Sequence, residues 1–182
     1  MEIEEIEEIL RNTRKAFFAY RNGIIADTLR RNGDPHKSIM GCQLTDVAVI
    51  AQQLENNAQL AEAFWNQHSS RECRMIAPML YPVAAFGQNT ALAWCLDVEN
   101  CEIADILCHR LLRKLDYAQA LVKQLLGYEA QLTRYTAFRL LLNIIITGTY
   151  KPSDNLRAIA EHELATAQGY LRPVLNSILE EI

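Results

Sequence analysis

The stretch "NCEIAD" at residues 100–105 gathers three side chains that could do chemistry. Cys101 carries a thiol, and Glu102 and Asp105 carry carboxylates, close to the predicted start of a helix. No basic side chain stands beside Cys101 to lower its pKa, so we disfavour a nucleophilic thiolate. A carboxylate can stabilise a positive charge that develops during a reaction, and Asp105 is our candidate for that task.

A helical wheel places Asp105 at the border between an apolar and a polar face. Each residue of a helix advances about 100°, so one stripe of the predicted helix is apolar and consists of Ile103, Leu107, Leu111 and Leu115. A second stripe is polar and holds Glu102, His109 and Arg113. Two interpretations of Asp105 follow. It is either a solvated carboxylate that pairs with His109 at i+4, or a partly desolvated anion at the lip of a concave groove.

Length and composition indicate one folded domain that spans residues 1–182. The chain has 182 residues, of which 50% are apolar, and this is enough for a sizeable core. Its formal net charge is −4, but seven glutamates stand at the two ends. Residues 11–179 therefore contain 18 basic and 15 acidic residues, which gives them a net charge of +3. This balance permits a phosphate-binding face, and the N-terminal glutamates form either a solvated helix face or a site for a basic partner.

Several classes of protein are disfavoured by the sequence. The five cysteines form no C-x-x-C pair and have no histidine at ligand spacing, so we expect reduced thiols and neither a metal nor another cofactor. No stretch approaches the roughly 18 uninterrupted apolar residues of a membrane span. The acidic N-terminus is unlike a targeting peptide, and we expect a cytoplasmic protein without a membrane partner.

Helical periodicity dominates the chain, and no convincing strand pattern occurs. About ten helices alternate with short breaks such as "NGDP" at 32–35 and "NN" at 56–57. The stretch "SSRE" at 69–72 predicts a capping box between Ser69 and Glu72. Short helices joined by tight turns predict an all-α fold, a HEAT-like α-α superhelix of stacked antiparallel helix pairs. An ordinary globular helix bundle is the structural alternative.

Four stretches between about residues 41 and 146 resemble the AlkD-like DNA alkylation repair family, whose members are armadillo-like HEAT-repeat proteins. The stretch at 60–82 resembles the family's Leu-Trp ending followed by a Glu-x-Arg-x-x-Ala helix, and the stretch at 92–107 resembles the approach to a Trp-Asp-x-x-Asp motif. The stretch at 115–127 resembles the next helix, and the stretch at 132–142 resembles a Trp-x-Arg-Arg-x-Ala segment. The four stretches are "LAEAFWNQHSSRECRMIAPMLYP", "LAWCLDVENCEIADIL", "LDYAQALVKQLLG" and "LTRYTAFRLLL".

The resemblance implies a function in DNA repair and a role for each matching residue. Family members bind duplex DNA and act on cationic alkylated bases such as 3-methyladenine and 7-methylguanine. Asp105 falls on the catalytic Asp, Glu102 on the first Asp of the motif, and Cys101 on its Trp. Arg134 falls on a phosphate-binding Arg, whereas Tyr135 replaces the second Arg. Arg71 and Arg74, with Arg110, Arg113 and Lys114, are further candidates for a basic DNA-binding face, or for solvated surface cations.

Three hypotheses for function remain open. The chain is a glycosylase-like enzyme that recognises or excises alkylated bases, a non-catalytic relative that binds DNA structures or proteins, or an interaction domain unrelated to DNA. Whether it is an enzyme stays open, because Cys101 cannot supply the aromatic face of the motif Trp. We expect the two tryptophans, Trp65 and Trp94, to pack in the core.

Overall fold

The computed structural model describes residues 1–150 and 156–182, and this part of the chain is helical without a strand. The all-α fold class predicted from the periodicity is therefore confirmed. The chain divides into two compact units, Met1–Phe86 and Gly87–Ile182. Within the described ranges, no helix is both long and apolar enough to cross a membrane.

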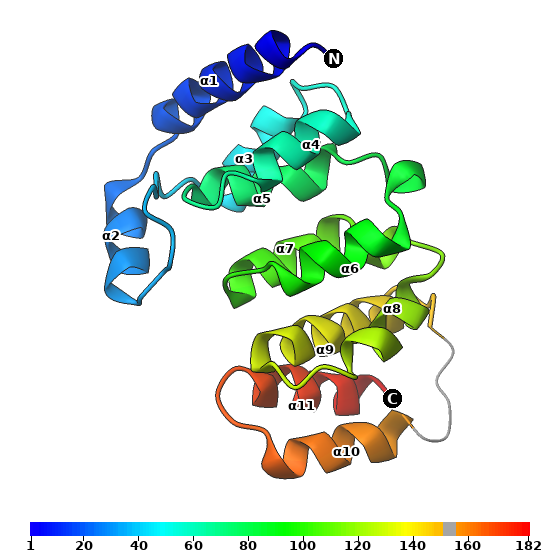
Figure 1. Ribbon diagram of the computed structural model, residues 1–182. Coiled ribbons are helices and arrows are strands. Elements are labelled where there is room, and N and C mark those ends of the chain that lie inside the picture. The colour runs from blue at the N-terminus through cyan, green and yellow to red at the C-terminus, as the bar shows by residue number, and fades with distance from the viewer. Residues whose placement is uncertain (151–155) are drawn as a thin grey trace. The chain divides into compact units, whose positions relative to one another are not determined.

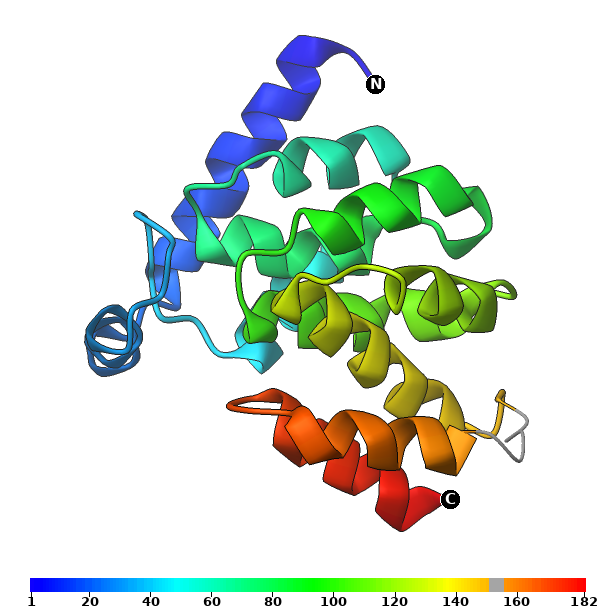
Figure 2. The same cartoon turned by 60° about the horizontal axis from the view of Figure 1, so that its bottom comes forward.

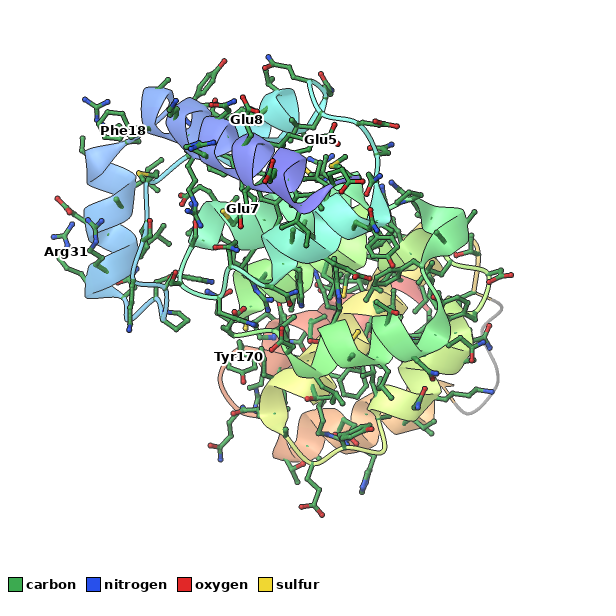
Figure 3. The ribbon with its side chains drawn as sticks, turned by 45° about the horizontal axis from the view of Figure 1, so that its top comes forward. Glu5, Glu7, Glu8, Phe18, Arg31 and Tyr170 are labelled. Carbon is green, nitrogen blue, oxygen red and sulfur yellow. The ribbon has the colours of Figure 1, made fainter. Side chains whose placement is uncertain are left out.

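The first unit contains five α-helices and one turn of 3₁₀ helix. They are α1 (Ile3–Ala19), α2 (Gly23–Arg31), α3 (Leu44–Ala51), α4 (Ala58–Trp65), α5 (Arg71–Leu80) and η1 (Val83–Ala85). Helix α5 packs against both α3 and α4, and α1 packs against the same two helices (Figure 1). Every residue of α5 but Met79 is buried, so this helix is the centre of the unit. The glutamates of α1 are exposed, and Figure 3 labels three of them along this helix.

Buried charges join α5 to the chain before α3. The carboxylate of Glu72 accepts hydrogen bonds from the backbone N–H groups of Met40 and Gly41, at 3.0 to 3.2 Å. Arg71 donates to Glu72 Oε1 at 3.0 Å and to the carbonyl of Cys42 at 3.1 Å. The predicted capping box is therefore wrong. The N-cap residue is Ser70 and makes no side-chain cap, because the carboxylate of Glu72 is engaged by a different segment of the chain.

The second unit contains six α-helices and one turn of 3₁₀ helix among its described residues. They are α6 (Gln88–Leu96), α7 (Cys101–Arg110), η2 (Leu112–Lys114), α8 (Ala118–Leu125), α9 (Gln131–Ile146), α10 (Leu156–Thr166) and α11 (Leu171–Glu181). Helix α9 packs against α7, α8 and α11, and α10 packs against α11. Figure 1 shows the pairs α6/α7, α8/α9 and α10/α11 as successive layers, and Figure 2 shows α10 and α11 side by side. This layering agrees with the predicted stacking of helix pairs.

Helix α7 begins at a capped end and buries the apolar stripe that the wheel predicted. The side chain of Asn100 accepts a hydrogen bond from the N–H of Ile103 at 2.9 Å, which satisfies one of the free donors at the helix start. Ile103, Leu107 and Leu111 are completely buried. The helix ends at Arg110, earlier than the apolar pattern suggests, and η2 continues the chain. The cap and the stripe together fix the rotation of α7, and therefore the direction in which Asp105 points.

Replacing Glu72 with alanine should destabilise the first unit strongly. The substitution leaves the Arg71 guanidinium without its carboxylate and removes the acceptor of two backbone N–H groups, and breaking a buried pair typically costs about 3–5 kcal/mol. Chemical denaturation followed by circular dichroism measures the loss. The control Glu5→Ala, on the exposed face of α1, should leave the midpoint unchanged. Equal midpoints for the two variants would contradict a structural role of Glu72.

Candidate functional site

Asp105 lies in the second turn of α7, where this helix packs against α9. Its side chain is 36% exposed, so it stands at the boundary between core and solvent, as the wheel predicted. The residues before and after it along the helix, Ala104 and Ile106, are buried. Asp105 is therefore a partly desolvated carboxylate that a ligand can still reach.

Two side chains from α9 hold one oxygen of this carboxylate. The hydroxyl of Tyr135 donates a hydrogen bond to Asp105 Oδ1 at 2.7 Å. Arg139 forms an ion pair with the same oxygen, with 3.0 Å between Nε and Oδ1. Tyr135 and Arg139 are four residues apart and so lie on one face of α9. Both partners contact Oδ1, and Oδ2 makes no hydrogen bond or ion pair with the described residues, so Oδ2 is the oxygen available to a ligand.

Opposing effects act on the ionisation of this carboxyl group. Burial raises the pKa of Asp105 above its ordinary value, and the nearby Glu102 carboxylate raises it further. The Tyr135 hydrogen bond and the Arg139 charge lower the pKa and oppose the effect of burial. Burial and the same hydrogen bond raise the pKa of the Tyr135 hydroxyl, which therefore stays protonated and keeps donating. The site thus keeps a carboxylate whose ionised form depends on its two neighbours.

An aromatic pair borders the carboxylate, and the sequence did not reveal it. The rings of Tyr135 and Tyr170 meet edge to face, with 5.2 Å between their centroids and 87° between their planes. Tyr135 is buried, whereas Tyr170, at the start of α11, is 39% exposed and is labelled in Figure 3. Tyr170 lies far from Asp105 in sequence and in a helix outside the stretches of family resemblance. No local pattern could have joined the two residues.

Cys101 lies next to this pair and remains a thiol. It is half-buried at the first position of α7. Burial, helped by the charge of Asp105, raises the pKa of Cys101 to about 11. A thiol with this pKa is protonated at neutral pH and is a poor nucleophile. The electrostatics of the site therefore favour Asp105 over Cys101 as its reactive group, in line with the interpretation from sequence.

The three arginines expected to contact DNA all make contacts within the protein. Arg134 donates to the carbonyls of Leu126 and Tyr128, and it pairs with Glu163. Its side chain is still 22% exposed. Its described contacts join α9 to the chain after α8 and to α10.

Arg71 and Arg74 belong to the first unit and are buried there. The Arg74 guanidinium donates to the carbonyl of Trp65 at 2.6 Å and stacks on the Trp65 ring at 3.5 Å from its centroid. Because the side chain of Arg74 is completely buried, it offers no surface to a phosphate in this structure. Both tryptophans are buried, as expected, so neither supplies an exposed aromatic face.

No group of three or more His, Cys, Asp or Glu side chains that could hold a metal ion occurs within residues 1–150 and 156–182. The donors around Asp105 are a phenol and a guanidinium, and a guanidinium repels a cation.

The fold and this site define a class of protein. The chain is an all-α protein of stacked helix pairs that carries a partly buried carboxylate bonded to Tyr135, whose ring packs against the exposed ring of Tyr170. A model of the DNA alkylation repair enzyme family matches residues 13–182, nearly the whole chain. The chain therefore belongs to this family, and the resemblance inferred from its motifs is confirmed. No curated protein and no solved structure matches the chain significantly.

Replacing Tyr135 with phenylalanine should raise the pKa of Asp105 further. The substitution removes the hydrogen bond that favours the ionised carboxyl group, while burial, which disfavours that form, stays. NMR titration of the side-chain carboxyl carbon follows this pKa directly. Tyr128→Phe is the matched control, because Tyr128 is exposed and has no described contact with Asp105. An unchanged or lowered pKa in Tyr135→Phe would show that the hydrogen bond does not control the ionisation of Asp105.

Proposed function

We propose that this member of the DNA alkylation repair family binds duplex DNA and excises cationic alkylated bases, with Asp105 as the catalytic carboxylate. The observation that carries the proposal is the geometry of Asp105. One of its oxygens is held by Tyr135 and Arg139, and the side chain still reaches solvent. The family relationship supplies the class of substrate.

The chemistry needs one well-placed negative charge. A base alkylated to a cation is already a good leaving group, so its glycosidic bond breaks without an acid. The bonding electrons leave with the base and neutralise it, and the deoxyribose is left as an oxocarbenium cation. Water then adds at C1′ and releases a proton. The barrier depends mainly on how well the sugar cation is stabilised, and a preorganised carboxylate in a partly dehydrated site does this effectively.

The contacts of Asp105 support this role. Fixing Oδ1 from two directions keeps the carboxylate oriented before substrate binds, so little reorganisation is needed during the reaction. Partial burial weakens the screening by water and so strengthens the attraction between the carboxylate and a sugar cation. Arg139 offsets part of the negative charge while it orients the carboxylate, and its side chain is 35% exposed.

Tyr170 supplies the aromatic face that Cys101 cannot. An electron-rich ring attracts a cationic base or sugar through its π face. A tyrosine ring can do this while its polar hydroxyl group remains in contact with water. The buried Tyr135 ring supports Tyr170 from the side, so the exposed ring has a defined position. The motif position four residues before Asp105 holds the thiol of Cys101, and the aromatic group comes from Tyr170 at the start of α11.

A second candidate function is a non-catalytic scaffold that binds DNA structures or a protein partner on the same fold. The observation that favours it is Cys101, which leaves the first turn of α7 without an aromatic ring. The two functions differ in one measurable property. The scaffold binds without releasing bases, whereas the enzyme releases bases in a reaction that depends on Asp105.

Replacing Asp105 with asparagine should abolish base release. Asparagine keeps an acceptor for the Tyr135 hydroxyl but carries no charge, and loss of such electrostatic stabilisation typically costs about 10²- to 10³-fold in rate. Release of 7-methylguanine from methylated duplex DNA is measured by chromatography. In the wild type, release should fall on the acidic side as Asp105 protonates, at a pH above that of an ordinary aspartate because its pKa is raised.

Glu129→Gln is the control, because Glu129 is exposed and lies outside the site. Release that persists in Asp105→Asn at the wild-type rate would remove Asp105 from the mechanism. No release by the wild type at high enzyme concentration would favour the scaffold.

A pair of substitutions at Tyr170 tests the aromatic face. Tyr170→Phe keeps the ring and should retain most of the activity, whereas Tyr170→Ala should lower the rate of release about tenfold, as expected for roughly 1–2 kcal/mol of cation–π attraction. Single-turnover kinetics on methylated duplex DNA gives both rates. Equal activity of the two variants would show that the ring does not act on the substrate.

A further inference from the structure

Four basic side chains gather where α7 ends and η2 begins. His109 and Arg110 form the last turn of α7, and Arg113 and Lys114 belong to η2. His109 and Lys114 are exposed, and Arg110 and Arg113 are partly exposed. We call these four residues the basic cluster.

The basic cluster is not compensated by acidic side chains in the described part of the chain. No ion pair or side-chain hydrogen bond there involves Arg110, Arg113 or Lys114. The Nε donor of Arg110 is buried and lacks a hydrogen-bond partner among these residues. A buried donor without an acceptor is costly, so this N–H group is free to donate to a bound acceptor.

The cations of the cluster repel one another. The pKa of His109 is lowered, first by burial and then by the charges of Arg113, Arg110, Lys114 and Arg139. The pKa of Lys114 is lowered by burial and by Arg113 and Arg110. Burial and neighbouring positive charges are therefore the main causes of both shifts. The attraction of basic groups to a helix carboxyl end accounts for His109 and Arg110, but it does not account for two further cations in η2.

A cavity adjoins the cluster. Its volume is about 350 Å³, and Arg113, Lys114, Gln119 and Thr149 contribute charged and polar groups to its lining. This volume is several times the roughly 30 Å³ that a water molecule occupies in the liquid. Asp116 also lines the cavity but forms no ion pair with Arg113 or Lys114. Two cations and two neutral hydrogen-bonding side chains are a suitable set for a phosphate group.

We propose that the basic cluster binds a backbone phosphate of nucleic acid and thereby sets the position of the strand relative to Asp105. The proposal rests on the proposed function, which places a nucleotide at Asp105. His109 is four residues after Asp105 along α7, roughly 6 Å along the helix axis, and Arg113 follows in η2 directly after α7 ends. Arg139 pairs with Asp105, and its positive charge also helps to lower the pKa of His109. The candidate site and the basic cluster therefore interact through the charge of Arg139.

The double variant Arg113→Gln with Lys114→Gln tests this binding on the full-length protein. Binding to an undamaged duplex is measured by fluorescence anisotropy between 50 and 200 mM salt. Each phosphate contact adds about 0.9 to the slope of log K against log salt concentration. Because the cluster is proposed to neutralise one phosphate, we expect the slope to fall by about 0.9 in the variant. The matched control Lys123→Gln with Arg172→Gln removes two exposed cations of the same unit and should keep the wild-type slope.

NMR titration of the His109 ring gives a second readout that does not depend on activity. The double variant should raise the pKa of His109, because two repelling charges are lost, and a bound duplex should raise this pKa in the wild type. Inorganic phosphate is titrated separately. If inorganic phosphate shifts His109 but the variant binds duplex with the wild-type slope, the cluster is a site for free phosphate and the proposal is overturned.

An absence of duplex binding by the wild type, or equal slopes for the double variant and its control, would also overturn the proposal. Base release decides the proposed function separately, because the binding experiment uses undamaged DNA. An enzyme that releases 7-methylguanine in a reaction dependent on Asp105, but binds duplex equally well without Arg113 and Lys114, would retain the proposed function and lose this inference.

Discussion

The packing of α9 against α7, α8 and α11 is the constraint on which the candidate site depends. This helix supplies Tyr135 and Arg139 to one carboxylate oxygen of Asp105, and its tyrosine ring supports Tyr170 from α11. Three helices that are remote in sequence therefore meet at one boundary between core and solvent. If α9 turned by one residue, about 100°, the phenol and the guanidinium would both leave the carboxylate. The ten buried residues of α9 hold it in place and make the rotation costly.

Charge is used in two different ways in the two units. In Met1–Phe86, Arg71 and Glu72 are buried together and satisfy backbone groups, so their charges hold segments of the chain in position. In Gly87–Ile182, Asp105 is only partly buried, and the basic cluster has no acidic partner among the described residues. A buried and fully bonded pair has little left to offer a ligand, whereas an incompletely compensated charge attracts one. This contrast favours the second unit as the place of the candidate site.

Sequence reasoning succeeded where the deciding interactions are local. The helices, the buried stripe of α7 and the border position of Asp105 follow from a period of 3.6 residues and from neighbours within one turn. The family relationship also followed from short helical motifs, and it extends beyond the stretches that suggested it. The reasoning failed at Ser69 and Glu72, where a pattern typical of a capping box was overridden by backbone donors at Met40 and Gly41. It also assigned Arg74 to a DNA surface, although the ring of Trp65 and a carbonyl group hold that side chain in the core.

The sequence by itself determined that this protein is helical, that it belongs to a DNA alkylation repair family, and that Asp105 is the carboxylate to examine. Periodicity and short motifs contain this information because they depend on residues within a few positions of one another. Only the tertiary structure decided which groups surround Asp105. Tyr135, Arg139 and Tyr170 are separated from it by whole helices, and their meeting depends on how α7, α9 and α11 pack. The stretch that contains Cys101 lacks an aromatic ring, and the fold brings one from α11, because side-chain packing selects neighbours by distance in space and not along the chain.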